Sequence, residues 1–181
     1  MNIDIRKIKK EIVFPLFLQS LSAGALASLL VIKTFPIMDS YNLFIIKKIL
    51  GIANKIDYGV LCEVFIKISL FTIIQFIALS FLFQVFSEIL CKIDMSFIDA
   101  AFIVSKPASL SALMLVCSFP WLLVTPATIV PFIFASFVLT LLYNHTNICS
   151  TFNINMSSGV FLTTSVYLIY FTFIFICIYK T

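Results

Sequence analysis

The stretch that decides the fold is Ala101–Tyr143, AFIVSKPASLSALMLVCSFPWLLVTPATIVPFIFASFVLTLLY. Its last charged residue is Lys106, and no Asp, Glu, Lys or Arg follows until Lys180. A water-soluble fold needs solvated groups on its outer faces, whereas a bilayer surrounds apolar faces with hydrocarbon. The sequence therefore predicts an all-α integral membrane protein, a bundle of five transmembrane helices with short interfacial helices.

The uncharged stretch Pro107–Tyr143 is too long for one membrane crossing. Its 37 residues would form a helix of about 55 Å, whereas the hydrocarbon core is only about 30 Å thick. Pro120, Trp121 and Pro126 mark a turn, because proline disfavours helix at the preceding residue and an indole suits a headgroup boundary. We expect a tight hairpin turn within residues 119–128, and a hinge used in a conformational cycle is the alternative.

Three short motifs in this hairpin follow one another in an order found in a known family. Lys106-Pro107 opens a predicted span, Phe119-Pro120-Trp121-Leu122 ends it, and Leu141-Leu142-Tyr143 closes the next. By the order and spacing of spans over residues 66–178, the chain resembles the Yip family of polytopic membrane proteins, which are named for interaction with Rab GTPases. The closer resemblance is to its bacterial inner-membrane branch, although the glycines common before the third span and after the fourth are missing. The resemblance implies five spans, a cytoplasmic N-terminus and a role in membrane organisation or trafficking.

Composition excludes several classes of protein. Of the 181 residues 62% are hydrophobic, which excludes a disordered or nucleic-acid-binding chain. The net charge of +4 is modest. The five cysteines are dispersed without CxxC spacing, so we expect neither a disulfide framework nor a zinc site and interpret them as small apolar residues.

The first span is predicted at residues 13–32. Residues 3–12 before it are predicted to form an amphipathic helix that lies on an anionic membrane surface, or else only a basic flank that orients the span. Ser20, Gly24 and Ser28 repeat at four-residue spacing, the small-xxx-small pattern that lets another helix approach closely. We expect a helix-packing seam inside the bundle, and a dimer face is the alternative.

The second span, predicted at residues 68–90, carries a polar stripe. Ser80, Gln84 and Glu88 share one helix face at four-residue spacing. A carboxylate in hydrocarbon is costly and usually faces the bundle interior or water. We expect Glu88 to be solvated at the boundary opposite Lys92, and an intramembrane polar site formed by the stripe is the alternative.

The remaining elements follow from the same apolar runs. The hairpin spans are predicted at residues 107–124 and 127–143, the fifth span at 159–178, and further interfacial helices at 42–54 and 96–104. A polar loop is predicted at residues 144–157, and its His145 lacks the neighbouring groups of a triad or metal site. Thr163, Thr164, Tyr167 and Tyr170 give the fifth span a polar stripe for interhelical hydrogen bonds.

No catalytic motif is recognisable in the sequence. HExxH, GxSxG, an acidic cluster and a glycine-rich phosphate loop are all missing, so we predict no catalytic, cofactor-binding or metal site. The expected partners are the lipid bilayer and a membrane-protein partner or second copy, and no nucleic acid. The leading hypothesis is a non-enzymatic scaffold or trafficking factor of Yip type. A small transporter or channel component is the first alternative, and a membrane enzyme is the second.

The orientation is predicted from the charges beside the first span. Arg6, Lys7, Lys9 and Lys10 precede that span in one cluster, and the first span usually dominates orientation. The basic residues of the whole chain divide equally between the two sides, so their count does not decide. We predict a cytoplasmic N-terminus and an outer C-terminus in a bacterial inner membrane. Ala25-Leu26-Ala27 is similar to a signal-peptidase site, but the apolar run continues to full spanning length and favours retention.

Overall fold

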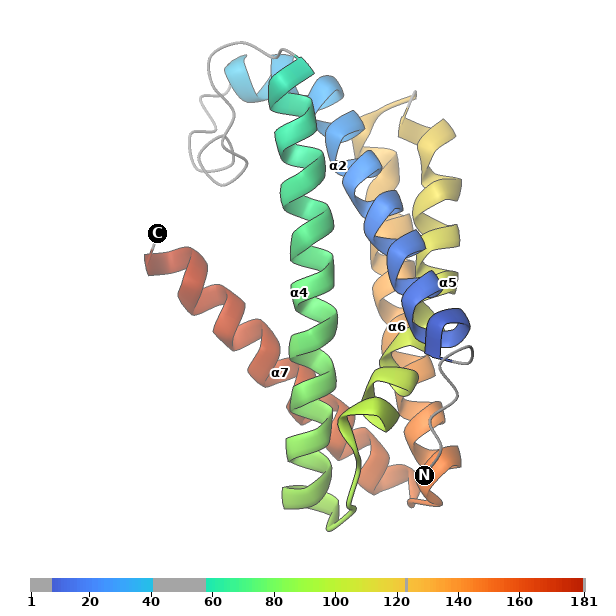
Figure 1. The fold of residues 1–181 in the computed structure, drawn as a ribbon. Coiled ribbons are helices and arrows are strands. Elements are labelled where there is room, and N and C mark those ends of the chain that lie inside the picture. The colour runs from blue at the N-terminus through green and yellow to red at the C-terminus, as the bar shows by residue number, and fades with distance from the viewer. Residues whose placement is uncertain (1–7, 41–57, 123, 181) are drawn as a thin grey trace.

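The computed structural model describes residues 8–40, 58–122 and 124–180. These residues form five long helices (Figure 1), and no strand occurs within these ranges. The long helices are α2 (Phe14–Ser40), α4 (Tyr58–Cys91), α5 (Phe97–Leu122), α6 (Val130–Phe152) and α7 (Met156–Lys180). A π-helix, η1 (Lys9–Val13), leads into α2, and a 3-10 helix, η2 (Pro126–Ile129), leads into α6.

Each of the five long helices contains an apolar segment of spanning length. All five are long and apolar enough to cross a membrane by length and composition. On α4, Lys67 and Glu88 are 21 positions apart, and Glu11 and Lys33 are 22 positions apart at the two ends of the first span. At a rise of about 1.5 Å per residue these uncharged segments measure roughly 31 and 33 Å, close to the hydrocarbon core of about 30 Å. The predicted all-α fold with five spanning-length helices is confirmed.

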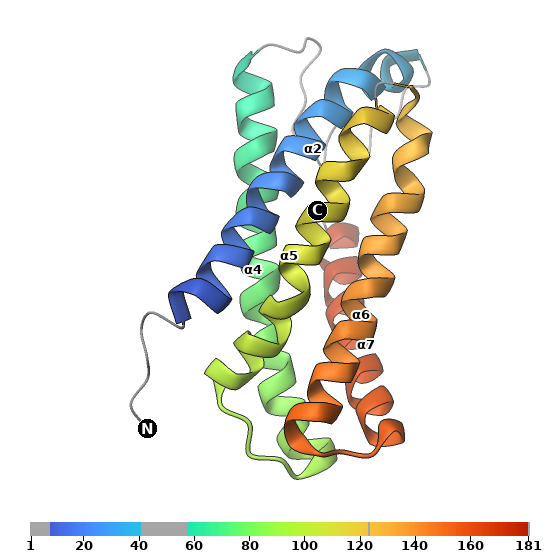
Figure 2. The same ribbon diagram turned by 90° about the vertical axis from the view of Figure 1, so that its right-hand side faces the viewer.

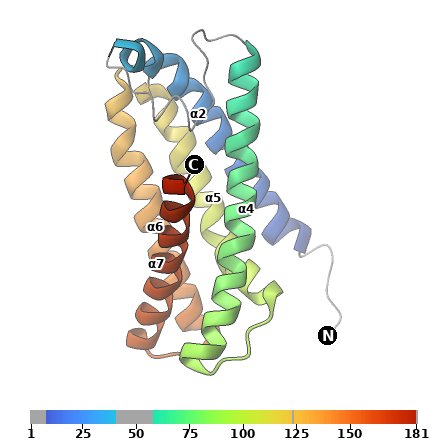
Figure 3. The same cartoon turned by 90° about the vertical axis from the view of Figure 1, so that its left-hand side faces the viewer.

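The helices form a bundle from which the last one diverges. α2 crosses α4 and α5, and α5 lies between α2 and α6 on one face (Figure 2). α7 lies beside α4 and α6 (Figure 3) and packs against both, and its later half tilts away from the bundle (Figure 1). We name the two ends of the bundle after the residues where α4 starts and stops, the Tyr58 end and the Cys91 end.

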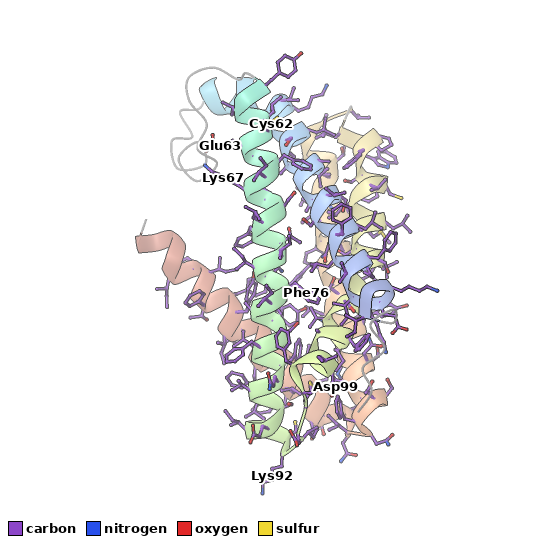
Figure 4. The ribbon with its side chains drawn as sticks, viewed as in Figure 1. Cys62, Glu63, Lys67, Phe76, Lys92 and Asp99 are labelled. Atoms are coloured by element: carbon purple, nitrogen blue, oxygen red, sulfur yellow. The ribbon has the colours of Figure 1, made fainter. Side chains whose placement is uncertain are left out.

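The largest buried cluster lies toward the Cys91 end, where α4, α5, α6 and α7 meet. Phe83, Ala100, Ile148 and Leu162, one from each of these helices, are all fully buried. Alanine at position 100 lets α5 approach its neighbours closely, and the bulky residues of the other three helices fill the space. Two charged residues of this end, Lys92 directly after α4 and Asp99 in the first turn of α5, are labelled in Figure 4.

The predicted interfacial helix at 96–104 is wrong as a separate element. Those residues are the first turns of α5, which continues without a break through Pro107. Ser96 and Asp99 explain the start. The Asp99 amide donates to Ser96 Oγ over 3.2 Å, and the Ser96 amide donates to Asp99 Oδ2 over 3.3 Å. This reciprocal capping begins the helix at the surface, and a proline inside a membrane helix is tolerated where neighbouring helices surround it.

The predicted polar loop at 144–157 is also wrong. α6 continues to Phe152, and only residues 153–155 connect it to α7. Asn153 ends the helix in the left-handed conformation, with φ of 51°, which asparagine adopts more easily than most residues. The polar residues from Asn144 to Thr151 therefore lie on a helix rather than in a loop, and only Asn153 and Asn155 lie in the connection.

Other predicted boundaries differ less. α4 begins at Tyr58, ten positions before the predicted residue 68, and its first turns are stabilised by an ion pair of 2.6 Å between Lys67 and Glu63. The predicted helix at 42–54 and residues 3–7 of the predicted N-terminal helix lie outside the described residues.

Candidate functional site

The structure places Ser20, Gly24 and Ser28 at the contact between α2 and α4. Ser20 Oγ donates to the Ser69 carbonyl over 3.0 Å, and Ser69 Oγ donates back to the Ser20 carbonyl over 3.1 Å. About two helical turns further along α2, Ser28 Oγ donates to the Leu61 carbonyl over 3.1 Å. These side-chain-to-backbone bonds require the two helix backbones to lie close together.

Gly24 makes this close approach sterically feasible. A methyl group at its Cα would collide with the Ser69 hydroxyl and would lie 2.9 Å from the Phe65 carbonyl oxygen. A helix backbone cannot move its carbonyl aside as a side chain moves its tip. The seam is therefore a contact between two helices of one chain, as the packing interpretation predicts. Glycine is required at position 24 because α4 leaves no space for a side chain there.

The residues predicted to turn the hairpin lie at the junction between α5 and α6. Pro120 is exposed in the last turn of α5, and Pro126 begins η2. Thr128 Oγ1 donates to the Trp121 carbonyl over 2.7 Å and closes the turn. The Trp121 ring is half exposed and lies 6.1 Å from that of Phe132, measured between centroids. This placement suits an aromatic residue at the edge of the apolar layer.

Ser80, Gln84 and Glu88 do not form one site. Ser80 is fully buried, and its hydroxyl donates to the Phe76 carbonyl of its own helix over 2.8 Å. Gln84 is half-buried, and Glu88 is exposed. The stripe thus runs from the core to the surface near the Cys91 end, and its polar groups do not converge on a common point.

The most buried polar pair in the bundle joins α6 to α7. Asn144 is fully buried, and its Nδ2 donates to the Tyr167 hydroxyl over 2.7 Å. The Tyr167 ring packs edge-on against Phe83 at 6.2 Å and against Phe137 at 6.1 Å between centroids. Sequence reasoning placed Asn144 in a loop and so missed this pair, although it expected Tyr167 to make an interhelical hydrogen bond.

Three buried side-chain atoms of α6 and α7 have no hydrogen-bond partner among the described residues. They are Asn144 Oδ1, Asn147 Nδ2 and Thr163 Oγ1. An unsatisfied buried donor or acceptor costs about 1–3 kcal/mol. A buried water commonly satisfies single groups of this kind.

A second polar chain connects three helices at a different level. Gln19 Nε2 on α2 donates to Ser111 Oγ on α5 over 3.3 Å. Ser111 Oγ and Ser136 Oγ on α6 are 2.6 Å apart. Nothing in the sequence identifies Gln19 as the partner of Ser111.

His145 and Cys149 lie one helical turn apart on α6. The distance between His145 Nδ1 and Cys149 Sγ is 3.7 Å. Both side chains face Gly159 of α7, because a methyl group there would collide with Cys149 Sγ and lie 3.1 Å from the imidazole ring. In the described ranges, no group of three or more His, Cys, Asp or Glu side chains is arranged to hold a metal ion.

Comparison with known proteins gives no family assignment. No family model, curated protein or solved structure matches this chain. The resemblance to the Yip family stays a prediction based on the order and spacing of the motifs.

Proposed function

We propose that this chain is a non-enzymatic integral membrane protein that organises other membrane proteins, as the Yip resemblance implies. Its intramembrane polar groups support this proposal, because they are used in contacts between helices. The Gln19–Ser111–Ser136 chain and the Asn144–Tyr167 pair both tie helices together. Such bonds give a bundle a fixed shape on which partners can assemble.

The observation that carries the proposal is the outer half of α7. No side chain described beyond Tyr170 on this helix is buried, and Phe171 and Phe175, which share one helix face at four-residue spacing, are 44% and 70% exposed. Between this half of α7 and α6 lies an apolar groove of about 520 Å³, whose lining includes Phe134 and Phe171. Association of helices in a bilayer is driven by side-chain packing rather than by exclusion of water. A protruding aromatic face beside a groove suits a transmembrane helix of another protein.

Site-specific photo-crosslinking in native membranes tests this assignment. A photoreactive residue at position 134, where Phe134 is 66% exposed and lines the groove, should give one discrete adduct with a second membrane protein. The matched control is position 81 on α4, where Phe81 is 57% exposed but does not line the α6–α7 groove. Replacing Val130 and Ile133, two exposed lining residues, by alanine should reduce the adduct at least several-fold without lowering the melting temperature. Equal adducts at both positions, or none at position 134, would contradict the proposal.

One observation favours the alternative of a small transporter or channel component. Asn144 Oδ1, Asn147 Nδ2 and Thr163 Oγ1 are buried and have no hydrogen-bond partner among the described residues, so polar groups remain available on α6 and α7. Purified protein in liposomes can be tested for proton or sodium flux with a dye. A flux that Thr163→Val abolishes would establish transport. Liposomes that show neither proton nor sodium flux would rule out transport of these two ions.

The proposed location is a bacterial inner membrane with the N-terminus in the cytoplasm. Cys62 and Lys92 lie at opposite ends of α4 (Figure 4), and Cys62 is exposed. With the N-terminus inside, Cys62 lies on the outer side, and Cys91 and Cys149 lie on the cytoplasmic side. An impermeant thiol reagent should label Cys62 in intact cells and spare the other two until the membrane is opened. Labelling of Cys149 in sealed cells would reverse the orientation.

A further inference from the structure

A groove follows α5 on the face where this helix lies between α2 and α6 (Figure 2). Its volume is about 580 Å³. α5 supplies most of the lining, α2 adds Leu18, and α6 adds Tyr143. Its lining includes Lys106, Ser109, Leu113 and Val116 from α5, together with Leu18 and Tyr143.

The polar end of this groove lies level with the expected membrane boundary. Ser105, next to Lys106, donates a hydrogen bond from Oγ to the Glu11 carbonyl over 2.7 Å. Glu11 marks one end of the uncharged segment of the first span, and Lys106 is the last charge on α5. Lys106 therefore lies near the level of Glu11, the expected membrane boundary of the first span.

The groove is as deep as one leaflet. From Lys106 to Val116 the helix advances ten positions, which corresponds to about 15 Å, half of the hydrocarbon thickness of about 30 Å. Tyr143 belongs to the polar end, because Ser136 pairs with Ser111 and α6 runs antiparallel to α5. Lysine, a serine hydroxyl and a phenol occupy one end, and leucine and valine occupy the other. A phospholipid has the same division into a polar and an apolar part.

The charge at the polar end favours an anion. Lys106 is exposed, and in the part of the chain that the structure describes the observed ion pair joins Glu63 and Lys67 on α4. Among the described residues no acidic side chain forms an ion pair with Lys106. Its ammonium is therefore available to a phosphate.

We propose that this groove binds one anionic phospholipid. The phosphate contacts the Lys106 ammonium and accepts hydrogen bonds from the hydroxyls of Ser109 and Tyr143. One acyl chain lies along Leu113 and Val116 of α5, with Leu18 of α2 as the opposite wall. The bound lipid completes the packing of this face, and its headgroup anchors α5 at the boundary.

Native mass spectrometry of the purified full-length protein tests the site. The protein is exchanged into mixed phosphatidylglycerol and phosphatidylcholine, and the lipid retained per chain is counted. Wild type should retain one phosphatidylglycerol in several-fold preference over phosphatidylcholine, and high salt should weaken that preference. Lys106→Gln should abolish the preference. Lys92→Gln is the matched control, because Lys92 is exposed at the same end but does not line the groove.

A second variant tests the acyl-chain half of the site. Leu113 is 57% exposed, so Leu113→Trp should fold normally while filling the groove. It should reduce retention of phosphatidylglycerol although Lys106 is intact, and Phe81→Trp on α4 should not. Equal retention of the two lipids by wild type, or an undiminished preference in Lys106→Gln, would overturn the proposal. Undiminished retention by Leu113→Trp would equally overturn it.

Discussion

The contact of α2 with α4 and the contact of α6 with α7 solve the same packing problem differently. Both place a glycine of one helix against the other. Gly24 faces the Phe65 carbonyl and the Ser69 hydroxyl, whereas Gly159 faces the side chains of His145 and Cys149. The first contact therefore brings two backbones together, and the second brings a backbone against side chains, which can change rotamer.

The hydrogen bonds of the two contacts follow the same division. Across α2 and α4 the serine hydroxyls donate to backbone carbonyls, for example Ser20 Oγ to the Ser69 carbonyl. Across α6 and α7 the central bond joins two side chains, Asn144 and Tyr167. A bond to a backbone fixes the separation of the helix axes, whereas a bond between side chains can form over a range of separations. We expect the first contact to be rigid and the second to be adjustable.

The largest expected effect comes from filling the rigid contact. Gly24→Leu should lower the free energy of unfolding by about 3 kcal/mol or more, because overpacking costs typically about 1–3 kcal/mol and here a backbone carbonyl must retreat. Gly159→Leu should cost less, since side chains can yield. Thermal unfolding of both variants in the same detergent measures the difference. If the two variants lose equal stability, the contacts do not differ in rigidity.

The next effect tests the side-chain pair. Asn144→Ala leaves the buried Tyr167 hydroxyl without its donor, and Tyr167→Phe leaves Asn144 Nδ2 without its acceptor. Each single change should cost about 1–3 kcal/mol, the penalty for an unsatisfied buried group. The double variant should lose less than the sum, because it leaves neither of these partners behind. Strict additivity in the double-mutant cycle would show that the 2.7 Å bond does not couple the helices.

A smaller effect is expected from single hydroxyls of the rigid contact. Ser69→Ala removes the bond to the Ser20 carbonyl and should cost about 0.6 kcal/mol, the average for such bonds between membrane helices. The same change removes the hydroxyl that a methyl group at Gly24 would meet first. Ser69→Ala should therefore relieve part of the loss in Gly24→Ala. Complete relief would mean that the Phe65 carbonyl imposes no limit.

The sequence predicted the rigid contact better than the adjustable one, for a physical reason. Small residues at four-residue spacing in an apolar run have few uses apart from helix contact, so Ser20, Gly24 and Ser28 could be recognised. Asn144, His145 and Asn147 are polar, and polar runs in a membrane chain usually lie outside the bilayer. Their burial depends on α7 folding back over them, which no local pattern in the sequence indicates.

The number of helices was predictable, and their ends were not. The length of each apolar run matches the thickness of the bilayer. Five spanning helices could therefore be predicted. A helix can continue beyond the bilayer where side chains cap its backbone. Ser96 and Asp99 cap the start of α5 in this way. The Ser96-x-x-Asp99 spacing was present in the sequence and would have placed the start of α5 correctly. The partner of Ser111, by contrast, lies 92 positions away at Gln19, and only the folded bundle brings the two together.

The smallest effect is expected at Glu88, outside both contacts. It is the reference with which the losses of stability at the two contacts are compared. Glu88 is exposed near the Cys91 end, while Ser80 of the same stripe is buried and bonded within its own helix. Glu88→Gln should therefore change the free energy of unfolding by less than about 0.5 kcal/mol, the usual range for surface substitutions. The melting temperatures of the variant and wild type should agree in both acidic and neutral buffer. A difference confined to one of the two buffers would show that the carboxylate meets a charged or desolvated neighbour. The stripe of Ser80, Gln84 and Glu88 would then be a functional polar site, and the α2–α4 and α6–α7 contacts would not account for all the polar groups of the bundle.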